Sequence, residues 1–283
     1  MANLLDIRRR IRSVRNTQQI TRAMKTVSAA KLRRAQERVF AARPYAAELG
    51  TVLAHLSARI EALEHPLLEV RPEEKILLVV VTADRGLCGA FNANVNRVAS
   101  AFIRERPDKE IQLIAVGRKG RDFFRRQGAA ILEEHINIFS ALNFGHARAI
   151  GERIVGFYSA AEFDAVYLVY NEFKSVIQQR LVIEPVLPLS RGALEGGVAQ
   201  VDYIYEQPPQ EIFNRLLPQY VESQVHRALL ESAAAEHGAR MAAMDTASRN
   251  AGEMIETLTL NMNRIRQAAI TREIIEVVSG ASA

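Results

Sequence analysis

Both ends of this chain carry long helical patterns that have almost no core of their own. Residues 1 to about 60 and about 210 to 283 place apolar side chains three and four positions apart, the mark of one helical face. A helix rises about 1.5 Å per residue, so the C-terminal segment could reach on the order of 100 Å. Narrow apolar stripes are typical of coiled coils. We therefore expect the two ends to pair as an antiparallel rod.

The two helices differ in their side chains. In the first, we expect the buried stripe to hold Ile7, Ile11 and Val14 and then a second group: Ile20, Met24 and Val27. Pro44 is expected to kink this helix or to mark its weakest point. In the second helix, seven of the fifteen residues from 233 to 247 are alanines. Small residues allow two helix backbones to approach closely and leave a smooth outer surface.

The middle of the chain has the pattern of an α/β domain. The apolar, β-branched run at 76–82 is typical of a buried parallel strand. Further strands and helices alternate after it, which predicts an open, mainly parallel sheet with flanking helices. The last two strands, at 163–173 and 176–187, are joined by a turn and could form an antiparallel hairpin. The predicted divisions are an N-terminal coiled-coil helix at 1–63, a Rossmann-like α/β domain at 76–190 and a C-terminal coiled-coil helix at 209–283.

Positive charge is concentrated at the N-terminus. The chain has a net charge of +5, and residues 1–43 carry twelve basic side chains against only Asp6 and Glu37. Such a helix needs a partner rich in carboxylates or phosphates. Nucleic acid is one alternative, but no aromatic residues are interleaved with the arginines and no known nucleic-acid-binding module accompanies them. We therefore favour a carboxylate-rich protein surface and expect no nucleic-acid partner.

Residues able to carry catalysis are sparse. The six histidines are scattered without metal-like spacing, and there is no phosphate-binding loop, so we expect no catalytic, cofactor or metal site. The loop after the first strand, TADRGLCGAFN, lies where α/β sheets bind ligands. Asp84 and Arg85 there could be catalytic, but we interpret them as a docking contact for another chain. Cys88 has only Arg85 as a basic neighbour in this loop, and a lone cysteine fits a reducing compartment.

Four segments resemble one known family. RQAAITREIIEVVSGASA at the C-terminus is similar to the signature of the gamma subunit of the F-type ATP synthase. IRRRIRSVRNTQQITRAMKTVSAAKLRRAQ, ADRGLCGAFN and YVESQVHRALLESAAAEHGARMAAMDTASRNA also resemble that family, in the same order along the chain. The resemblance starts within the first few residues, so we expect no transit peptide and a bacterial protein. Residues 190–210 lack the paired cysteines of the plastid members, so thiol regulation is not expected.

The resemblance implies a rotary part rather than an enzyme. In this family the paired helices form a shaft inside a ring of three alpha and three beta subunits, and the α/β domain is a foot. The foot rests on the membrane rotor ring and holds the epsilon subunit, at the cytoplasmic face of the bacterial inner membrane. The nucleotide chemistry belongs to the beta subunits. By resemblance, rotor–stator contacts map to Met24, Lys25, Arg266, Gln267, Thr271 and Glu273. Tyr205 and Glu206 map to the foot, beside the docking pair Asp84 and Arg85.

Overall fold

The computed structural model describes residues 4–58, 60, 65–175, 179–189 and 206–281. These residues divide into two compact units. The first unit contains residues 1–29 and 240–283, and the second contains residues 30–239. Helices α1 (Leu4–Ser57) and α6 (Pro209–Ala281) each contribute to both units. The predicted boundaries at 1–63, 76–190 and 209–283 follow the secondary structure rather than these units, and they stay a prediction.

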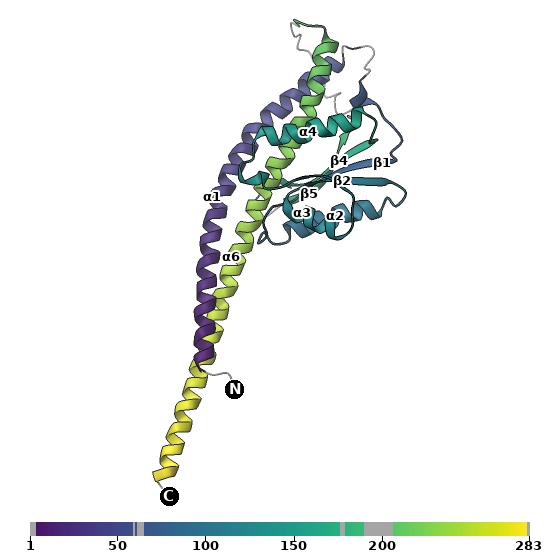
Figure 1. Cartoon of the computed structure of the whole chain (residues 1–283). Coiled ribbons are helices and arrows are strands. Elements are labelled where there is room, and N and C mark those ends of the chain that lie inside the picture. The colour runs from purple at the N-terminus through teal and green to yellow at the C-terminus, as the bar shows by residue number, and fades with distance from the viewer. Residues whose placement is uncertain (1–3, 59, 61–64, 176–178, 190–205, 282–283) are drawn as a thin grey trace. The chain divides into compact units, whose positions relative to one another are not determined.

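The second unit is built around a five-stranded sheet (Figure 1). Its strands are β1 (Lys75–Val81), β2 (Glu110–Val116), β3 (Ile131–His135), β4 (Ala165–Phe173) and β5 (Gln179–Leu187). Their order is β3-β2-β1-β4-β5, and neighbouring strands are parallel except for β4 and β5. The mainly parallel sheet is therefore confirmed, and the last two strands do form an antiparallel pair.

Helices cover both faces of this sheet. Helices α2 (Phe91–Arg104) and α3 (Arg118–Arg126) lie on one face, and α4 (Phe144–Ser159) lies on the other (Figure 1). Short 3₁₀ helices occupy Pro66–Leu68 and Ile138–Ser140. All six residues of β1 after Lys75 are buried, because the central strand has helices on both sides. Alternate residues Ile76, Leu78 and Val80 form one core with Phe102 and Phe124 from α2 and α3.

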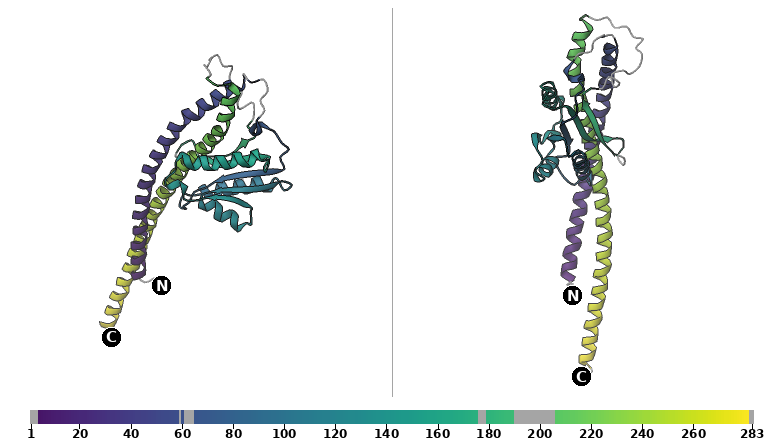
Figure 2. Two further views of the ribbon diagram at one scale, coloured as in Figure 1. Left: turned by 45° about the horizontal axis from the view of Figure 1, so that its top comes forward. Right: turned by 90° about the vertical axis from the view of Figure 1, so that its right-hand side faces the viewer.

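The long helices pair with each other inside each unit. In the second unit, α1 and α6 bury an apolar seam in which Leu53, Leu56, Phe213, Leu217 and Val221 have no exposed area. Helix α1 continues through Pro44, and α6 continues through Pro218. In the first unit α6 extends past the start of α1 at Leu4 (Figure 2). Among the described residues, no helix combines the length and the apolar content needed to cross a bilayer.

Candidate functional site

The helix seam of the first unit is narrower and more polar than the sequence pattern predicts. Ile7 and Ile11 are buried as expected, but Ile20 and Val27 are 60% and 56% exposed, so their placement on the buried stripe was wrong. The buried positions nearby are instead Thr21 and Ser28, both in the same unit. The reason is periodicity. A coiled-coil seam repeats every 3.5 residues, which continues 7, 11 and 14 through 18, 21, 25 and 28. Residues 20 and 27 are each one position off that series.

Small and polar residues hold this part of the seam together. The hydroxyl oxygens of Thr21 and Ser248 lie 2.6 Å apart, and the Gln18 amide donates to the backbone carbonyl of Ser248 at 3.1 Å. A Cβ at Gly252 would lie 3.1 Å from the Gln18 amide nitrogen. The two helices therefore meet at hydrogen-bonding distance here, as the small residues of the C-terminal helix predicted.

Lys25 closes the same seam with an ion pair. Its ammonium donates to Asp245 Oδ1 at 2.6 Å, although both side chains are more than a third exposed. This hydrogen bond from Lys25 is the main reason that the pKa of the Asp245 carboxyl lies below its usual value. Lys25 thus has a partner within its own chain, which the sequence did not suggest. Met24 beside it is half-buried.

The end of α6 is exposed on all sides. From Thr271 to Ala281 every residue is exposed, as are Arg266 and Gln267. Thr271 donates a hydrogen bond to the Gln267 carbonyl within the same helix. Apolar side chains are exposed here too: Ile270, Ile274, Ile275, Val277 and Val278. The predicted contact residues Arg266, Gln267, Thr271 and Glu273 therefore all belong to one exposed helix end.

The arginines of α1 in the first unit are also exposed. They are Arg8, Arg9, Arg10, Arg12, Arg15 and Arg22. In the described part of the chain, none of them forms an ion pair with a carboxylate of this protein. Their charge is therefore available to a partner surface.

In the second unit a buried carboxylate fastens α6 to the sheet. The Glu231 side chain is 5% exposed. Its Oε1 accepts hydrogen bonds from Arg43 of α1 at 2.9 and 3.3 Å, and its Oε2 accepts one from the backbone N–H of Phe173 in β4 at 3.0 Å. One side chain thus joins both long helices to the sheet. The sequence contained one signal of this role, an acidic residue directly after Leu229–Leu230 and separated by one residue from three alanines.

Two further contacts attach α6 to β5. Arg227 donates to the Glu184 carboxylate, which also accepts a hydrogen bond from the Tyr170 hydroxyl at 2.7 Å. Burial is the main cause that raises the pKa of Tyr170 above its usual value. The Arg227 charge opposes this rise, and the Glu184 charge and hydrogen bond add to it. The Gln179 amide donates to the carbonyl of Ala235 in α6 at 2.9 Å.

On the other face, α4 packs closely against α6. A Cβ at Gly151 would lie 2.8 Å from Cγ and 3.1 Å from Cα of Glu222, closer than side chains normally approach. Burial raises the pKa of the Glu222 carboxyl. The helix pair is therefore held by side-chain contacts from two faces, and only a residue without a side chain fits at position 151.

The Asp84 loop has a structural role within the chain. Asp84 Oδ1 accepts hydrogen bonds from the backbone N–H groups of Arg118 and Asn137 at 3.1 and 2.8 Å, which ties together the loops that follow three strands. Arg85 is exposed. Cys88 is 1% exposed and receives a hydrogen bond from the Asn92 amide at 3.1 Å, a poor setting for a nucleophile. Docking by Asp84 and Arg85 stays a prediction.

The remaining predicted positions add little chemistry. Glu206 is exposed, and Tyr205 lies outside the described residues. Over the ranges that the structure describes, no group of three or more His, Cys, Asp or Glu side chains is arranged to hold a metal ion.

Comparisons with known proteins agree with this geometry. A family profile described as ATP synthase matches residues 3–283. The ATP synthase gamma chain of Solibacter usitatus is 55% identical over 287 residues, which cover 100% of this chain and 99% of the relative. That of Pelotomaculum thermopropionicum is 48% identical over 283 residues, with the same coverage.

Solved structures are similar to this chain as well. A chain of the central stalk and c-ring structure of the Tetrahymena thermophila mitochondrial ATP synthase is 28% identical, with a TM-score of 0.64. The match covers 81% of this chain and 99% of that chain. A chain of the Euglena gracilis mitochondrial ATP synthase rotor has a TM-score of 0.65 at 18% identity, over 94% of this chain and 98% of that chain. This second likeness supports the fold alone.

Proposed function

The chain belongs to the ATP synthase gamma chain family, and from that premise we propose that it is the central-stalk shaft of a rotary ATP synthase. It has no catalytic role of its own: ion flow through a membrane rotor turns it, and its asymmetry drives ATP synthesis at beta-subunit sites. Its partners are three alpha and three beta subunits around the helix pair, with an epsilon subunit and the rotor ring at the foot. It binds no nucleic acid.

One observation carries this proposal: the last turns of α6 extend past α1 with apolar side chains exposed. Ile274, Ile275 and Val277 are 58%, 58% and 70% exposed. An unpaired apolar helix end needs a partner surface. A sleeve formed by other subunits supplies that surface and allows the helix to turn within it.

The predicted rotor–stator contacts fit this arrangement. Ile20 and Val27 flank the half-buried Met24, so an apolar row lies on the exposed side of α1 next to the seam. Arg266, Gln267, Thr271 and Glu273 lie on the exposed end of α6. We assign these positions, with Met24, to contacts with the alpha and beta subunits. We assign Lys25 to the same contacts, because its side chain is still 46% exposed while its ammonium pairs with Asp245.

The attachment points in the second unit explain how torque reaches the shaft. Glu231 and Glu184 connect α6 to neighbouring strands of the sheet by charged hydrogen bonds, so a force applied to the sheet domain is passed directly to the helix. We assign the loop of Asp84 and Arg85, together with Tyr205 and Glu206, to docking at the foot. We propose that the chain is a peripheral part of the complex, at the cytoplasmic face of the bacterial inner membrane.

Co-expression with the alpha and beta subunits of the same organism tests the proposal. We expect one copy of this chain to co-purify with three alpha and three beta subunits, and the complex to hydrolyse ATP. A cysteine introduced at the exposed Lys109 can carry a rotation probe, because the natural Cys88 is buried. The probe should then rotate in one direction when ATP is added.

Two results would contradict the proposal that this chain is the rotating shaft. Active hexamers that form and leave this chain free would show that it is not part of the complex. A probe that stays still while the complex hydrolyses ATP would show that the chain is bound but is not the rotating part. A chain lacking residues 270–283 is the matched variant, and we expect it to assemble poorly or to hydrolyse ATP with weakened coupling.

A further inference from the structure

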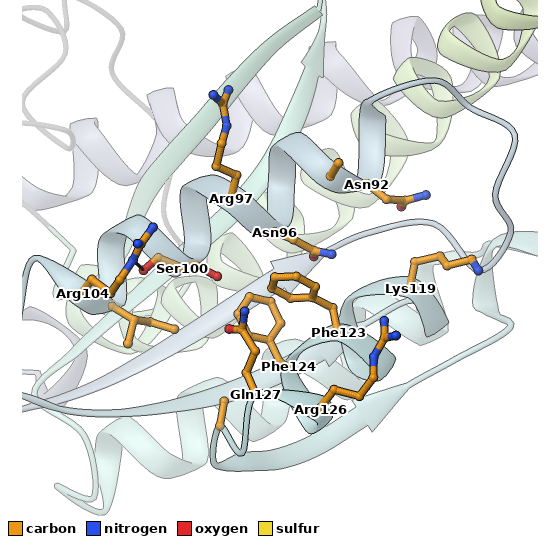
Figure 3. A pocket seen from close by; sticks show the side chains of 13 residues that line it. Asn92, Asn96, Arg97, Ser100, Arg104, Lys119, Phe123, Phe124, Arg126 and Gln127 are labelled. Carbon is orange, nitrogen blue, oxygen red and sulfur yellow. Dashed lines mark hydrogen bonds between the residues drawn. The ribbon is translucent and has the colours of Figure 1, made fainter.

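Helices α2 and α3 are separated by a cleft that the shaft function does not use. Its volume is about 740 Å³, and it is lined by thirteen residues of which Figure 3 shows the side chains. Pockets for small molecules usually measure about 300–1,000 Å³. The cleft is therefore large enough for an organic ligand.

The floor of the cleft is apolar and aromatic. Phe124 is 1% exposed, and its ring packs edge-on against that of Phe123 with centroids 5.1 Å apart. Figure 3 shows the Phe123 ring beneath the Asn96 amide, on the side of the cleft where the α3 side chains point toward α2. A flat ring system can pack on such a surface.

Two buried polar atoms in the cleft wall have no partner. Asn96 is 6% exposed, and neither its Oδ1 nor the Ser100 hydroxyl has a hydrogen-bond partner among the described residues. Native proteins rarely leave buried polar atoms in this state, because desolvation without a hydrogen bond is unfavourable. A ligand that donates a hydrogen bond to Asn96 would satisfy one of them.

All the charged side chains that line the cleft are positive. Its lining includes Arg97, Arg104, Lys119 and Arg126 and no acidic residue. Figure 3 shows Lys119 and Arg126 toward one end and Arg104 toward the other, while Arg97 points away from the other side chains. Arg104 and Arg126 donate only to backbone carbonyls of their own helices, and no described carboxylate pairs with Lys119. A cleft with unneutralised positive charge attracts anions.

We propose that this cleft binds an organic anion that combines a flat ring system with a phosphate or carboxylate group. The ring packs on Phe123 and donates a hydrogen bond to Asn96 Oδ1, and the anionic group lies between Lys119 and Arg126. This site goes beyond the shaft function and is separate from the helix seam. Nucleotides and aromatic carboxylates whose ring carries an N–H share this chemistry.

Equilibrium dialysis of the full-length chain at low ionic strength tests the site. The two probes are ADP and indole-3-acetate, whose rings both carry an N–H donor, and adenosine and pyrophosphate serve as probes that carry only one half of the chemistry. We expect at least one of the first two to bind at least tenfold more tightly than either half. ADP alone would identify a nucleotide site, and indole-3-acetate alone a site for aromatic carboxylates with a ring N–H.

Charge reversal locates the site without disturbing the core. Lys119→Glu with Arg126→Glu changes two exposed side chains, and we expect it to weaken binding at least tenfold. Lys109→Glu with Arg215→Glu makes the same change in charge at exposed residues outside the cleft and should leave binding within twofold. Phe123→Leu should weaken binding of the ring-bearing probe and leave pyrophosphate unaffected.

Three results would overturn the proposal. They are no binding of either ring-bearing probe, equal loss in both charge-reversed variants, and pyrophosphate binding as tight as that of ADP. Because the readout is binding rather than ATP hydrolysis, failure here would leave the shaft function untouched.

Discussion

Removing the Glu231 carboxylate should loosen the attachment of α6 to the sheet. In Glu231→Ala the buried N–H of Phe173 loses its acceptor, which costs about 1–3 kcal/mol. The lost pairing with Arg43 adds only about 0–1 kcal/mol, because that guanidinium is 44% exposed and screened by water. We therefore expect a loss of about 1–4 kcal/mol in local stability. Glu231→Gln keeps the shape of the side chain and should cost less.

Hydrogen exchange at the Phe173 amide measures this effect directly. A loss of about 2 kcal/mol corresponds to roughly 30-fold faster exchange through local opening. Glu256→Gln is the matched control, since it neutralises an exposed glutamate on the same helix. In the assembled complex, Glu231→Ala should lower ATP synthesis more than ATP hydrolysis, because torque passes less directly from the sheet to the helix. Unchanged exchange at Phe173 in a folded Glu231→Ala chain would refute this reasoning.

Three further changes test other contacts. Gly151→Ala should lower the free energy of unfolding, measured with urea, by about 1–3 kcal/mol, because the new Cβ would lie 2.8 Å from Cγ of Glu222. An unchanged free energy of unfolding would show that α4 moves away from α6 freely. Lys25→Met should raise the pKa of Asp245 toward its ordinary value, as read by NMR titration. Because the pKa of Asp245 is lowered in the folded chain, the ion pair stabilises the seam above about pH 4, and this stabilisation is lost as the pH falls through the folded pKa. An unchanged pKa of Asp245 in the Lys25→Met variant would show that another group lowers it. Met24→Lys adds a cation to the row that faces the beta subunits and should reduce the protons pumped per ATP in membranes, and an unchanged ratio would contradict that placement.

The sequence predicted the architecture well because its signals are local. The continuous run at 76–82 identifies a strand buried on both faces, and alternation of strands with helices requires a mainly parallel sheet. The sequence left open whether the last two strands pair with each other as an antiparallel hairpin, and the structure shows that β4 and β5 do. For the long helices, length and spacing alone indicated pairing.

Details of the helix seam and its attachments were not predictable in the same way. Ile20 and Val27 continue the apolar pattern by residue type, but the 3.5-residue repeat places Thr21 in the seam instead. Partner choice also depends on distant segments. Nothing near Glu231 in the sequence indicates that Phe173 lies within hydrogen-bonding distance, since 58 residues separate them. Likewise Lys25 was expected to face a partner subunit, and its ion pair with Asp245 spans 220 residues.

The contact between Gln18 and Ser248 also sets the order in which this protein can be made. The two residues are 230 positions apart, so the seam of the first unit cannot form until most of the chain has been translated. At about 5–20 residues per second this interval is on the order of 10–50 s. During that time residues 4–29 of α1 lack the segment of α6 with which they pair in the first unit, while the sheet between the two helices can already fold. The nascent α1 is therefore the segment that a chaperone or the acidic surface of a partner subunit has the longest opportunity to capture.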